Sequence, residues 1–298
     1  MKNNAKEKGF GYLAILLAML FWGFSFVWIK HLLNNHFPVF TIVFIRLTLA
    51  SVVFITLLSL RKKLQRIERG DFKDFLLLAF FEPFLYFIGE DFGLKYVDAS
   101  FAAVIIALIP IVISITMYFA DRTPIRWEFV VGTLVSVAGV LMLTTSPNGQ
   151  AVFSLKGTLL LSLAVLAAAG YSVQLTRLLK KYTPVTITTW QNFIAIPFYL
   201  PLLLIFDVKQ WPSLTWDFSA VLSLVCLALL CSAGAYMLYS YSVKKLTVSK
   251  TCVFTNLIPI VTLVVAAAIG QETFTQTKFW GILVIVAGVT FSQLRVKS

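Results

Sequence analysis

Two ionisable side chains, Arg46 and Glu82, stand inside long apolar stretches of this 298-residue chain. Arg46 lies eight residues into the stretch 38–60, and Glu82 lies nine residues into 73–95. At about 1.5 Å of helical rise per residue, each would lie about 12 Å deep, near the middle of a bilayer. A charge at that depth costs about 2.5–3.5 kcal/mol on insertion scales. The pattern therefore indicates either an ion pair that fixes two helices or a site that binds a substrate charge or a proton.

Pro83 follows Glu82 directly and predicts a kink, because a proline inside a helix frees a carbonyl one turn back. Bent helices near the bilayer midplane are typical of binding sites in carriers. Glu82, Tyr86 and Glu90 are spaced four apart, which predicts one shared helical face. Two carboxyls and a phenol are unfavourable against lipid, so this face indicates either a substrate site or a solvated vestibule.

Other polar and aromatic side chains occur at membrane depth in most of the remaining apolar stretches. Each would hydrogen-bond either to a substrate or to a neighbouring helix. Together they predict an aromatic, mildly polar cavity suited to small zwitterions or flat organic molecules. The candidate substrate-binding residues are Trp22, Ser25, Arg46, Glu82, Tyr86, Glu90, Tyr171, Gln174, Trp190, Asn192, Tyr236, Tyr239 and Asn256.

The composition places these side chains in a membrane protein. Residues of the set AVILMFWYC make up 59% of the chain and charged residues only 13%, against about half and about 25% in typical soluble proteins. A soluble enzyme, a DNA-binding domain and a secreted disulfide scaffold are therefore excluded, and the net charge of +12 is not read as a nucleic-acid footprint. Cys226, Cys231 and Cys252 lack metal-site spacing and are interpreted as small packing residues.

The apolar stretches predict ten transmembrane helices and hence an all-α membrane protein. The first stretch is too long for a signal peptide and is interpreted as a retained helix. With the N-terminus in the cytosol, 19 of the 25 lysines and arginines lie on the cytosolic side and five outside, Arg46 being intramembrane. The positive-inside rule thus predicts two cytoplasmic termini. The expected helices span about 10–31, 38–60, 73–95, 98–120, 127–145, 155–178, 184–206, 218–243, 248–270 and 278–295.

The two halves of the chain repeat each other at an offset that drifts from 146 to 149. Pro38 matches Pro184, Pro110 matches Pro259, and glycines at 132 and 139 match those at 281 and 288. The repeats are expected over residues 1–150 and 151–298. Because five helices are an odd number, the second copy must be inverted, which is the architecture of alternating-access transporters. The paired glycines are assigned to close helix packing.

Several of these residues resemble the start of an EamA-type repeat of the drug/metabolite transporter superfamily. They are the stretch Phe21–Val27, then Pro38 and Phe44-Ile45-Arg46, Ala99-Ser100 leading to Pro110, and the pattern from Gly132 to Val140. The resemblance covers both halves. It implies a ten-helix secondary carrier in a bacterial inner membrane that exports amino acids or other small metabolites. The second copy departs from the first, with Ala168-Ala169-Gly170 for Phe21-Trp22-Gly23 and Asn192 for Arg46.

No Walker A sequence, HExxH or nucleophile elbow occurs. The sequence therefore predicts no enzyme, no cofactor and no metal site, and it favours an ion gradient or the substrate's own gradient as the energy source. The expected partners are a small-molecule substrate and membrane lipid, without nucleic acid; protons are one option for the coupling ion, which the sequence does not identify, and no oligomeric state is specified. Two alternatives stay open: a broad exporter of drugs or organic cations, and a membrane-embedded enzyme or lipid-handling protein.

Overall fold

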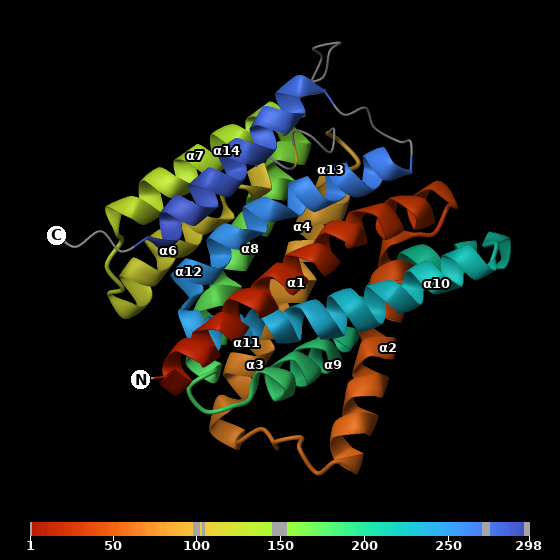
Figure 1. Ribbon diagram of the computed structural model, residues 1–298. Coiled ribbons are helices and arrows are strands. Elements are labelled where there is room, and N and C mark those ends of the chain that lie inside the picture. The colour runs from red at the N-terminus through yellow and green to blue at the C-terminus, as the bar shows by residue number, and fades with distance from the viewer. Residues whose placement is uncertain (1, 98–101, 103–104, 145–153, 270–274, 295–298) are drawn as a thin grey trace. The chain divides into compact units, whose positions relative to one another are not determined.

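A computed structural model describes residues 2–97, 102, 105–144, 154–269 and 275–294. All regular elements in these ranges are helical (Figure 1), which confirms the predicted all-α class. Several sequence expectations lie outside the described residues. They are the start of the fourth predicted helix at 98–101 with Ala99 and Ser100, the turn at 146–149, and the terminal cations Arg295 and Lys297.

Most helices follow the predicted stretches, although α6 begins at Ile109 within the stretch predicted at 98–120. The helix in 73–95 is interrupted at Glu82, whereas within 184–206, 218–243 and 248–270 the helix type changes inside continuous helical segments. The elements are α1 (Lys2–Asn34), α2 (Val39–Leu60), η1 (Arg69–Asp71), α3 (Phe72–Ala79), η2 (Phe80–Leu85), α4 (Tyr86–Gly93), α6 (Ile109–Asp121), α7 (Trp127–Thr144), α8 (Leu155–Leu178), α9 (Pro184–Leu202), η3 (Leu203–Asp207), η4 (Val208–Ser213), α10 (Phe218–Cys226), η5 (Leu227–Ala235), α11 (Tyr236–Leu246), α12 (Val248–Cys252), η6 (Val253–Leu257), α13 (Ile258–Ala268) and α14 (Gln276–Gln293).

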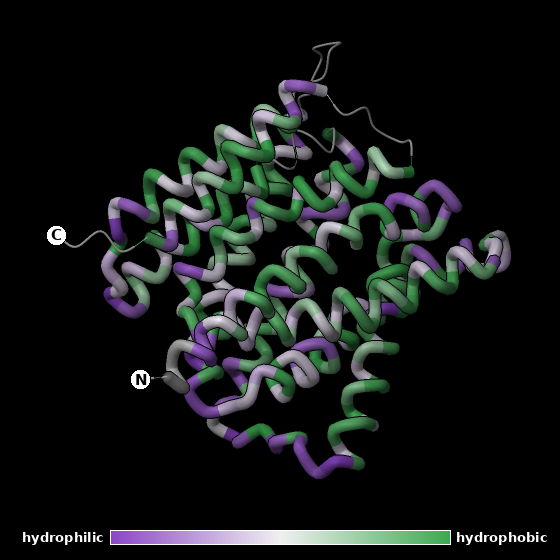
Figure 2. Tube along the Cα trace, viewed as in Figure 1, coloured by the Kyte–Doolittle hydropathy of each residue, from purple (hydrophilic) through white to green (hydrophobic). Residues whose placement is uncertain are grey.

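Six helical segments in the described residues are long and apolar enough to cross a membrane. They are Lys6–Asn34, Val39–Leu60, Leu155–Leu178, Pro184–Ser213, Phe218–Leu246 and Val248–Val265. Two shorter apolar helices cover Ile109–Asp121 and Trp127–Leu143. The hydropathy pattern agrees, since α2 is mostly apolar while the connection that follows it is rich in hydrophilic residues (Figure 2). The chain is therefore a multi-pass membrane protein.

The chain divides into two compact units. Unit 1 comprises residues 1–84 and 174–245, and unit 2 comprises residues 85–173 and 246–298. Each unit thus combines segments from both halves of the sequence. This division by contact is a different one from the division by sequence repeat, and the repeat boundary near 150 stays a prediction.

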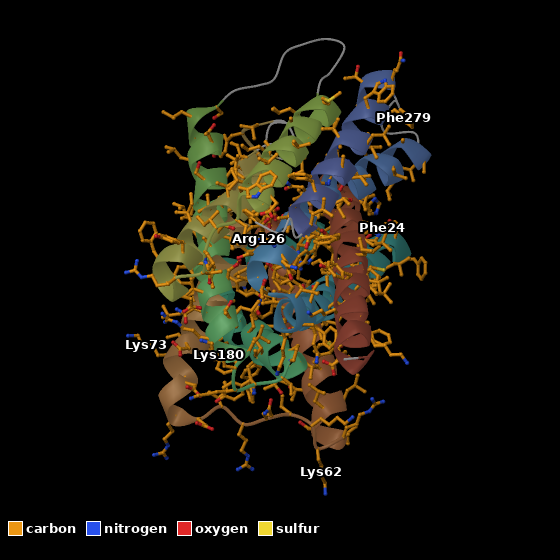
Figure 3. All side chains as sticks on the ribbon, turned by 60° about the vertical axis from the view of Figure 1, so that its left-hand side comes forward. Phe24, Lys62, Lys73, Arg126, Lys180 and Phe279 are labelled. Carbon is orange, nitrogen blue, oxygen red and sulfur yellow. The ribbon has the colours of Figure 1, made fainter. Side chains whose placement is uncertain are left out.

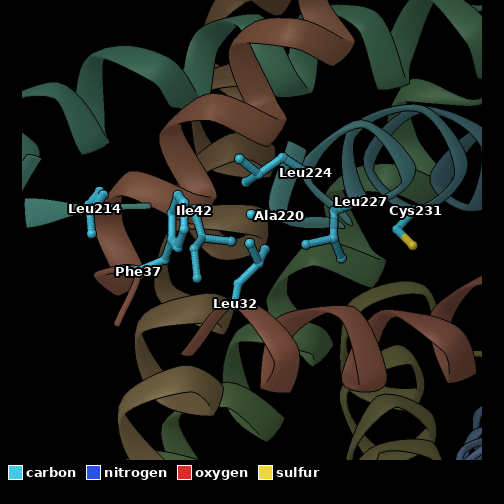
Figure 4. Packing of buried hydrophobic residues seen from close by; sticks show 8 residues of the cluster. All are labelled: Leu32, Phe37, Ile42, Leu214, Ala220, Leu224, Leu227 and Cys231. Carbon is cyan, nitrogen blue, oxygen red and sulfur yellow. The ribbon is translucent and has the colours of Figure 1, made fainter. Parts of the chain in front are cut away.

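Unit 1 contains a buried apolar cluster where α1 ends, α2 begins and α10 passes. Leu32 and Phe37 flank the turn between α1 and α2, and Leu224 of α10 packs with them. Figure 4 shows the whole cluster, which consists of Leu32, Phe37, Ile42, Leu214, Ala220, Leu224, Leu227 and Cys231. Burial of these side chains fixes α2 against η5 and so positions the intramembrane charge of Arg46.

Helices α2 and α9 run antiparallel within unit 1. At one end, Asp207 Oδ2 accepts hydrogen bonds from the Thr41 backbone N–H at 2.7 Å and the Thr41 Oγ1 at 3.2 Å. At the other end, the Thr183 backbone N–H donates to Gln65 Oε1 at 2.7 Å. Asp207 therefore caps α2 from a distant part of the chain, because Pro38 at the N-cap provides no side-chain acceptor.

We expect Asp207→Ala to lower the free energy of unfolding by about 2 kcal/mol, since it leaves a buried helix N-terminus without its charged acceptor. Asp207→Asn keeps an acceptor oxygen and should lower it by less. The measurement is an SDS titration of the micelle-solubilised protein followed by tryptophan fluorescence. Identical titrations for wild type and Asp207→Ala would contradict the capping role.

Helices α7 and α14 form a close antiparallel pair in unit 2 (Figure 1). A Cβ added at Gly132 would lie 2.6 Å from the Gly288 carbonyl oxygen, and one added at Gly139 would lie 2.8 Å from the Gly281 carbonyl oxygen. Arg126 Nη2 donates to the Leu294 carbonyl at 3.0 Å, in the same antiparallel register. The contacts agree with the packing role predicted for the four glycines.

The connection between α2 and α3 is folded onto the turn between α8 and α9. Lys181 Nζ lies 2.8 Å from Asp71 Oδ1, and the Tyr182 hydroxyl donates to Asp71 Oδ2 at 2.8 Å. The Glu68 backbone N–H donates to the Tyr182 hydroxyl at 3.0 Å. Lys62, Lys73 and Lys180 lie toward this same end of unit 1 (Figure 3). We call it the basic end.

We expect acid to open this connection. The hydrogen bonds from Lys181 and Tyr182 hold the pKa of Asp71 below its usual range. A depressed carboxyl pKa stabilises the fold above the unfolded-state value of about 4. That contribution is lost as the pH falls through the lower folded value. The protection factors of residues 61–71, which compare each hydrogen-exchange rate with the intrinsic rate at the same pH, should therefore fall at acid pH in wild type, whereas in Asp71→Asn they should be low at every pH. Equal pH profiles for the two proteins would contradict the assignment.

Candidate functional site

The helix that carries Glu82 is interrupted at that residue. Glu82 has extended backbone angles, φ −146° and ψ 122°, between the helical turns of α3 and α4. The Tyr199 hydroxyl of α9 donates to the Pro83 carbonyl at 3.1 Å and to the Phe84 carbonyl at 3.0 Å. These contacts fix α9 against the first residues after the break. The predicted kink is confirmed.

Glu82 is hydrogen-bonded to a tyrosine of α11. The Tyr236 hydroxyl donates to Glu82 Oε1 at 2.7 Å, with Glu82 8% exposed and Tyr236 2% exposed. The Trp22 ring centroid lies 5.2 Å from that of Tyr236 and 5.4 Å from that of Tyr239. We call these four residues the Glu82 cluster. It places one carboxyl against an aromatic wall inside unit 1.

Arg46 and Asn192 meet at Ser232 of η5. Arg46 Nε donates to Ser232 Oγ at 2.8 Å, and Asn192 Nδ2 donates to the Ser232 carbonyl at 2.7 Å. Arg46 is 2% exposed, and the other two are fully buried. Because 46 and 192 are matching positions of the sequence repeat, equivalent helices converge on one serine. We call these three residues the Ser232 junction.

The ion pair considered between Arg46 and Glu82 is not among the contacts of the described residues. Arg46 bonds to a serine hydroxyl and Glu82 to a phenol hydroxyl. The two partners, Ser232 and Tyr236, lie four residues apart across the end of η5. The break at Glu82 explains the difference, because it directs the carboxyl to α11. The two side chains are therefore bonded to different partners of the η5–α11 segment.

The remaining candidates fall into two groups. In unit 1, Ser25 Oγ donates to the Trp22 carbonyl of its own helix at 2.6 Å, and Trp190 Nε1 donates to the Gln65 carbonyl near the basic end at 2.9 Å. Gln174 is buried in α8. Ser25 thus donates to the backbone of a residue in the Glu82 cluster, whereas Trp190 donates to the connection after α2.

Tyr86, Glu90, Tyr171 and Asn256 belong to unit 2. The Tyr86 hydroxyl donates to Glu90 Oε1 at 3.0 Å, so these two do share a face. Asn256 Nδ2 donates to Ser136 Oγ at 2.6 Å, and Tyr171 is buried in α8. The prediction that Glu82 shares a regular helical face with Tyr86 and Glu90 is wrong, because the extended backbone at Glu82 interrupts the helix there.

Several buried polar residues of unit 1 were missed by sequence reasoning. Gln191 and Thr188 of α9 and Ser240 of α11 are fully buried, and their side-chain polar atoms have no hydrogen-bond partner in the protein. Ser232 and Tyr199 were also missed. Gln191 stands beside two predicted residues and three positions after Thr188, so its position on the same face was the available signal.

No group of three or more histidine, cysteine, aspartate or glutamate side chains that could hold a metal occurs in the part of the chain that the structure describes. The three cysteines are free thiols, with Cys231 and Cys252 buried. The chemistry available at the Glu82 cluster is therefore that of a carboxyl beside a phenol and an indole. The Ser232 junction adds a buried guanidinium.

Comparison with known proteins gives a consistent result. The sequence model of the EamA-like transporter family matches residues 9–145 and again residues 155–293. An uncharacterized transporter of Archaeoglobus fulgidus is 27% identical over 279 residues, covering 93% of this chain and 96% of its own. The uncharacterized transporter YetK of Bacillus subtilis is 25% identical over 300 residues, covering 98% and 89%.

One more distant relative has a more specific name. A probable terminal-alkyne amino-acid exporter of Streptantibioticus cattleyicolor is 27% identical over 183 residues, covering 59% of this chain and 58% of its own. A solved crystal structure matches 97% of this chain and 96% of its own with a TM-score of 0.79. At 18% identity it shows a likeness of fold alone.

Proposed function

The chain belongs to the EamA-like transporter family, and from that premise we propose that it is a secondary transporter that exports amino acids or related small metabolites by alternating access. The observation that carries the proposal is the Glu82 cluster. A carboxyl held by one phenol, with an indole and a second phenol beside it, suits a substrate amine. The name of the relative from Streptantibioticus cattleyicolor supports an amino acid as cargo.

The Ser232 junction supports a zwitterionic substrate. A guanidinium binds a carboxylate through paired hydrogen bonds, whereas the Glu82 carboxyl attracts an ammonium group. Arg46 and Glu82 both belong to unit 1, and their partners Ser232 and Tyr236 lie about one turn apart in the η5–α11 segment. An amino acid presents these two groups on one carbon, so we assign Arg46 to the substrate carboxylate and Glu82 to the amine or to a coupling proton.

Two helix pairs support an inverted ten-helix repeat. Gly132 contacts Gly288 and Gly139 contacts Gly281. In the sequence repeat, position 132 corresponds to 281 and position 139 to 288. Replacing each glycine of the pair Gly132–Gly288 by its counterpart therefore gives the pair Gly281–Gly139, which is the relation expected about a two-fold axis. The equivalent helices α2 and α9 are antiparallel as well. Inverted repeats are the usual basis of alternating access.

We also propose a bacterial inner membrane location with both termini in the cytoplasm. The basic end of unit 1 combines exposed Lys62, Lys73 and Lys180, and the positive-inside rule assigns such an end to the cytosol. Proteoliposome counterflow tests the function: vesicles loaded with an unlabelled L-amino acid should accumulate the same labelled compound without nucleotide. Accumulation of none of the twenty amino acids would contradict the assigned cargo.

A second candidate is an exporter of organic cations. The aromatic rings of Trp22, Tyr236 and Tyr239 around a buried carboxyl favour it, because cations bind aromatic faces. Competition decides between the two: a cationic dye such as ethidium should inhibit less than an amino acid if the proposal holds. A membrane-embedded enzyme would convert its substrate without moving solute, so positive counterflow would exclude that alternative.

A further inference from the structure

Helix α11 carries a line of polar side chains from the Glu82 cluster to the basic end of unit 1. Tyr236, Ser240 and Lys244 are spaced four apart and so lie on one face of a regular helix. Tyr236 bonds to Glu82, and Lys244 Nζ donates to the Tyr182 carbonyl at 3.2 Å. Lys244 is exposed, so solvent begins about 12 Å along the helix from Tyr236.

Ser240 lies midway along this line and is fully buried, with no protein partner for its hydroxyl. Helix α9 brings a second such hydroxyl near the Tyr236 end of this line. Asn192 contacts Ser232, and Tyr182 contacts Lys244, so α9 and α11 are antiparallel in a fixed register. Thr188 shares the face of Asn192, one turn nearer the basic end, and its Oγ1 also has no protein partner.

Gln191, next to Asn192, adds a fully buried amide whose two polar atoms lack protein partners. Buried hydroxyls and amides are almost always hydrogen-bonded, and where the protein supplies no partner, ordered water does. Ser240 lies between Tyr236 and the exposed Lys244, Thr188 lies near the level of Tyr236, and Gln191 lies about one turn farther from the basic end, beside Asn192. The interval between the Glu82 cluster and the basic end is therefore polar and needs water.

We propose that Ser240, Thr188 and Gln191 hold a short chain of water that carries protons between Glu82 and the basic end of unit 1. This route rests on the proposed function, because it would supply the proton that couples transport. In a transfer, the Tyr236 O–H proton passes to Glu82 Oε1 while the phenol oxygen takes a proton from the water at Ser240. Each water then takes a proton from the next water toward Lys244, and the last one takes a proton from solvent. The net result is one proton added to Glu82.

The surroundings of Glu82 agree with this route. The titratable and charged groups of unit 1 whose contacts place them in the Glu82 cluster, at the Ser232 junction or at the break include Tyr199 of α9, Tyr236 and Tyr239 of α11, Arg46 of α2 and Cys231 of η5. Of these, Tyr236 is the one bonded to the carboxyl. The proton consequently reaches Glu82 through Tyr236, the first residue of the polar line on α11.

The test follows protonation of Glu82 directly in protein reconstituted into lipid nanodiscs. A pH jump is followed by infrared absorption of the protonated carboxyl, assigned by its loss in Glu82→Gln. We expect Ser240→Ala and Thr188→Val to slow protonation about tenfold, and Thr188→Ser to restore the rate because it keeps the hydroxyl. Ser223→Ala is the matched control, since Ser223 is buried and donates to the Ser219 carbonyl of its own helix.

Unchanged rates in both Ser240→Ala and Thr188→Val would overturn the route, as would equal slowing in Ser223→Ala. Should one of these two variants fail to fold, the other is compared with Ser223→Ala, and an unchanged rate in it overturns the route. Amino-acid counterflow is recorded on the same proteins. Counterflow with an unslowed pH jump refutes the route alone, whereas a slowed pH jump without counterflow refutes the proposed cargo and leaves the route standing.

Discussion

Glu82→Gln is expected to lower proton-driven accumulation of substrate in proteoliposomes by about 100-fold, the lower range of what a positioned proton-transfer group contributes. Glutamine keeps the size and can still accept the hydrogen bond from Tyr236, so the break and the aromatic wall should persist. Counterflow, which needs no net proton movement, should fall much less. The variant therefore separates loss of coupling from loss of the site.

Tyr236→Phe is the companion variant. It retains the carboxyl and the ring contact with Trp22 while removing the donor to Glu82. We expect proton-driven accumulation in Tyr236→Phe to lie between that of wild type and that of Glu82→Gln. Full proton-driven accumulation in Glu82→Gln would remove Glu82 from the coupling mechanism, and an equal loss of counterflow in that variant would assign the residue to substrate binding instead.

Gly288→Ala is expected to destabilise unit 2 by about 2–3 kcal/mol, the range for overpacking a close contact. An added Cβ would lie 2.5 Å from the Ser136 backbone nitrogen and 2.6 Å from the Gly132 carbonyl. Because the obstructing atoms are backbone, α7 and α14 must separate to accept one methyl group. Gly132→Ala should have a similar effect, since its Cβ would meet Gly288 and Ser292 in the same way.

Gly9→Ala is the matched control for this prediction. Gly9 lies in α1 with nothing within 4 Å of an added Cβ, so alanine should be neutral or slightly stabilising. Unfolding in SDS, followed by circular dichroism, measures all three variants. Equal stability of Gly288→Ala and Gly9→Ala would show that α7 and α14 do not approach as closely as their glycines indicate.

Local sequence signals predicted the helices well. The stretch 155–178 is helical over that same range, because its apolar run is bounded by clear polar residues. The kink at Glu82 followed from Pro83, whose effect on the backbone is local. The glycines at 132, 139, 281 and 288 predicted close packing, since spacing by seven puts them on one face of each helix.

The partners within the site followed less well, because they depend on contacts between distant segments. The Ser232 junction joins α2, α9 and η5, and a serine in an apolar stretch gives no signal of its own. Glu82 was considered as a partner for Arg46, yet it bonds to Tyr236 because the break redirects its side chain. Asp207 likewise caps a helix that begins at Val39, a contact that no local pattern marks.

The inverted duplication is tested most directly by the sidedness of two matching positions. Lys62 follows α2 and Lys209 follows the equivalent helix α9, and both are exposed. In a chain whose three native cysteines are replaced by alanine, single cysteines at these positions are treated on intact cells with a membrane-impermeant maleimide. An inverted repeat predicts that Lys209→Cys is labelled from outside and Lys62→Cys only after permeabilisation. Labelling of both from the same side would contradict the inverted repeat and with it alternating access between equivalent halves.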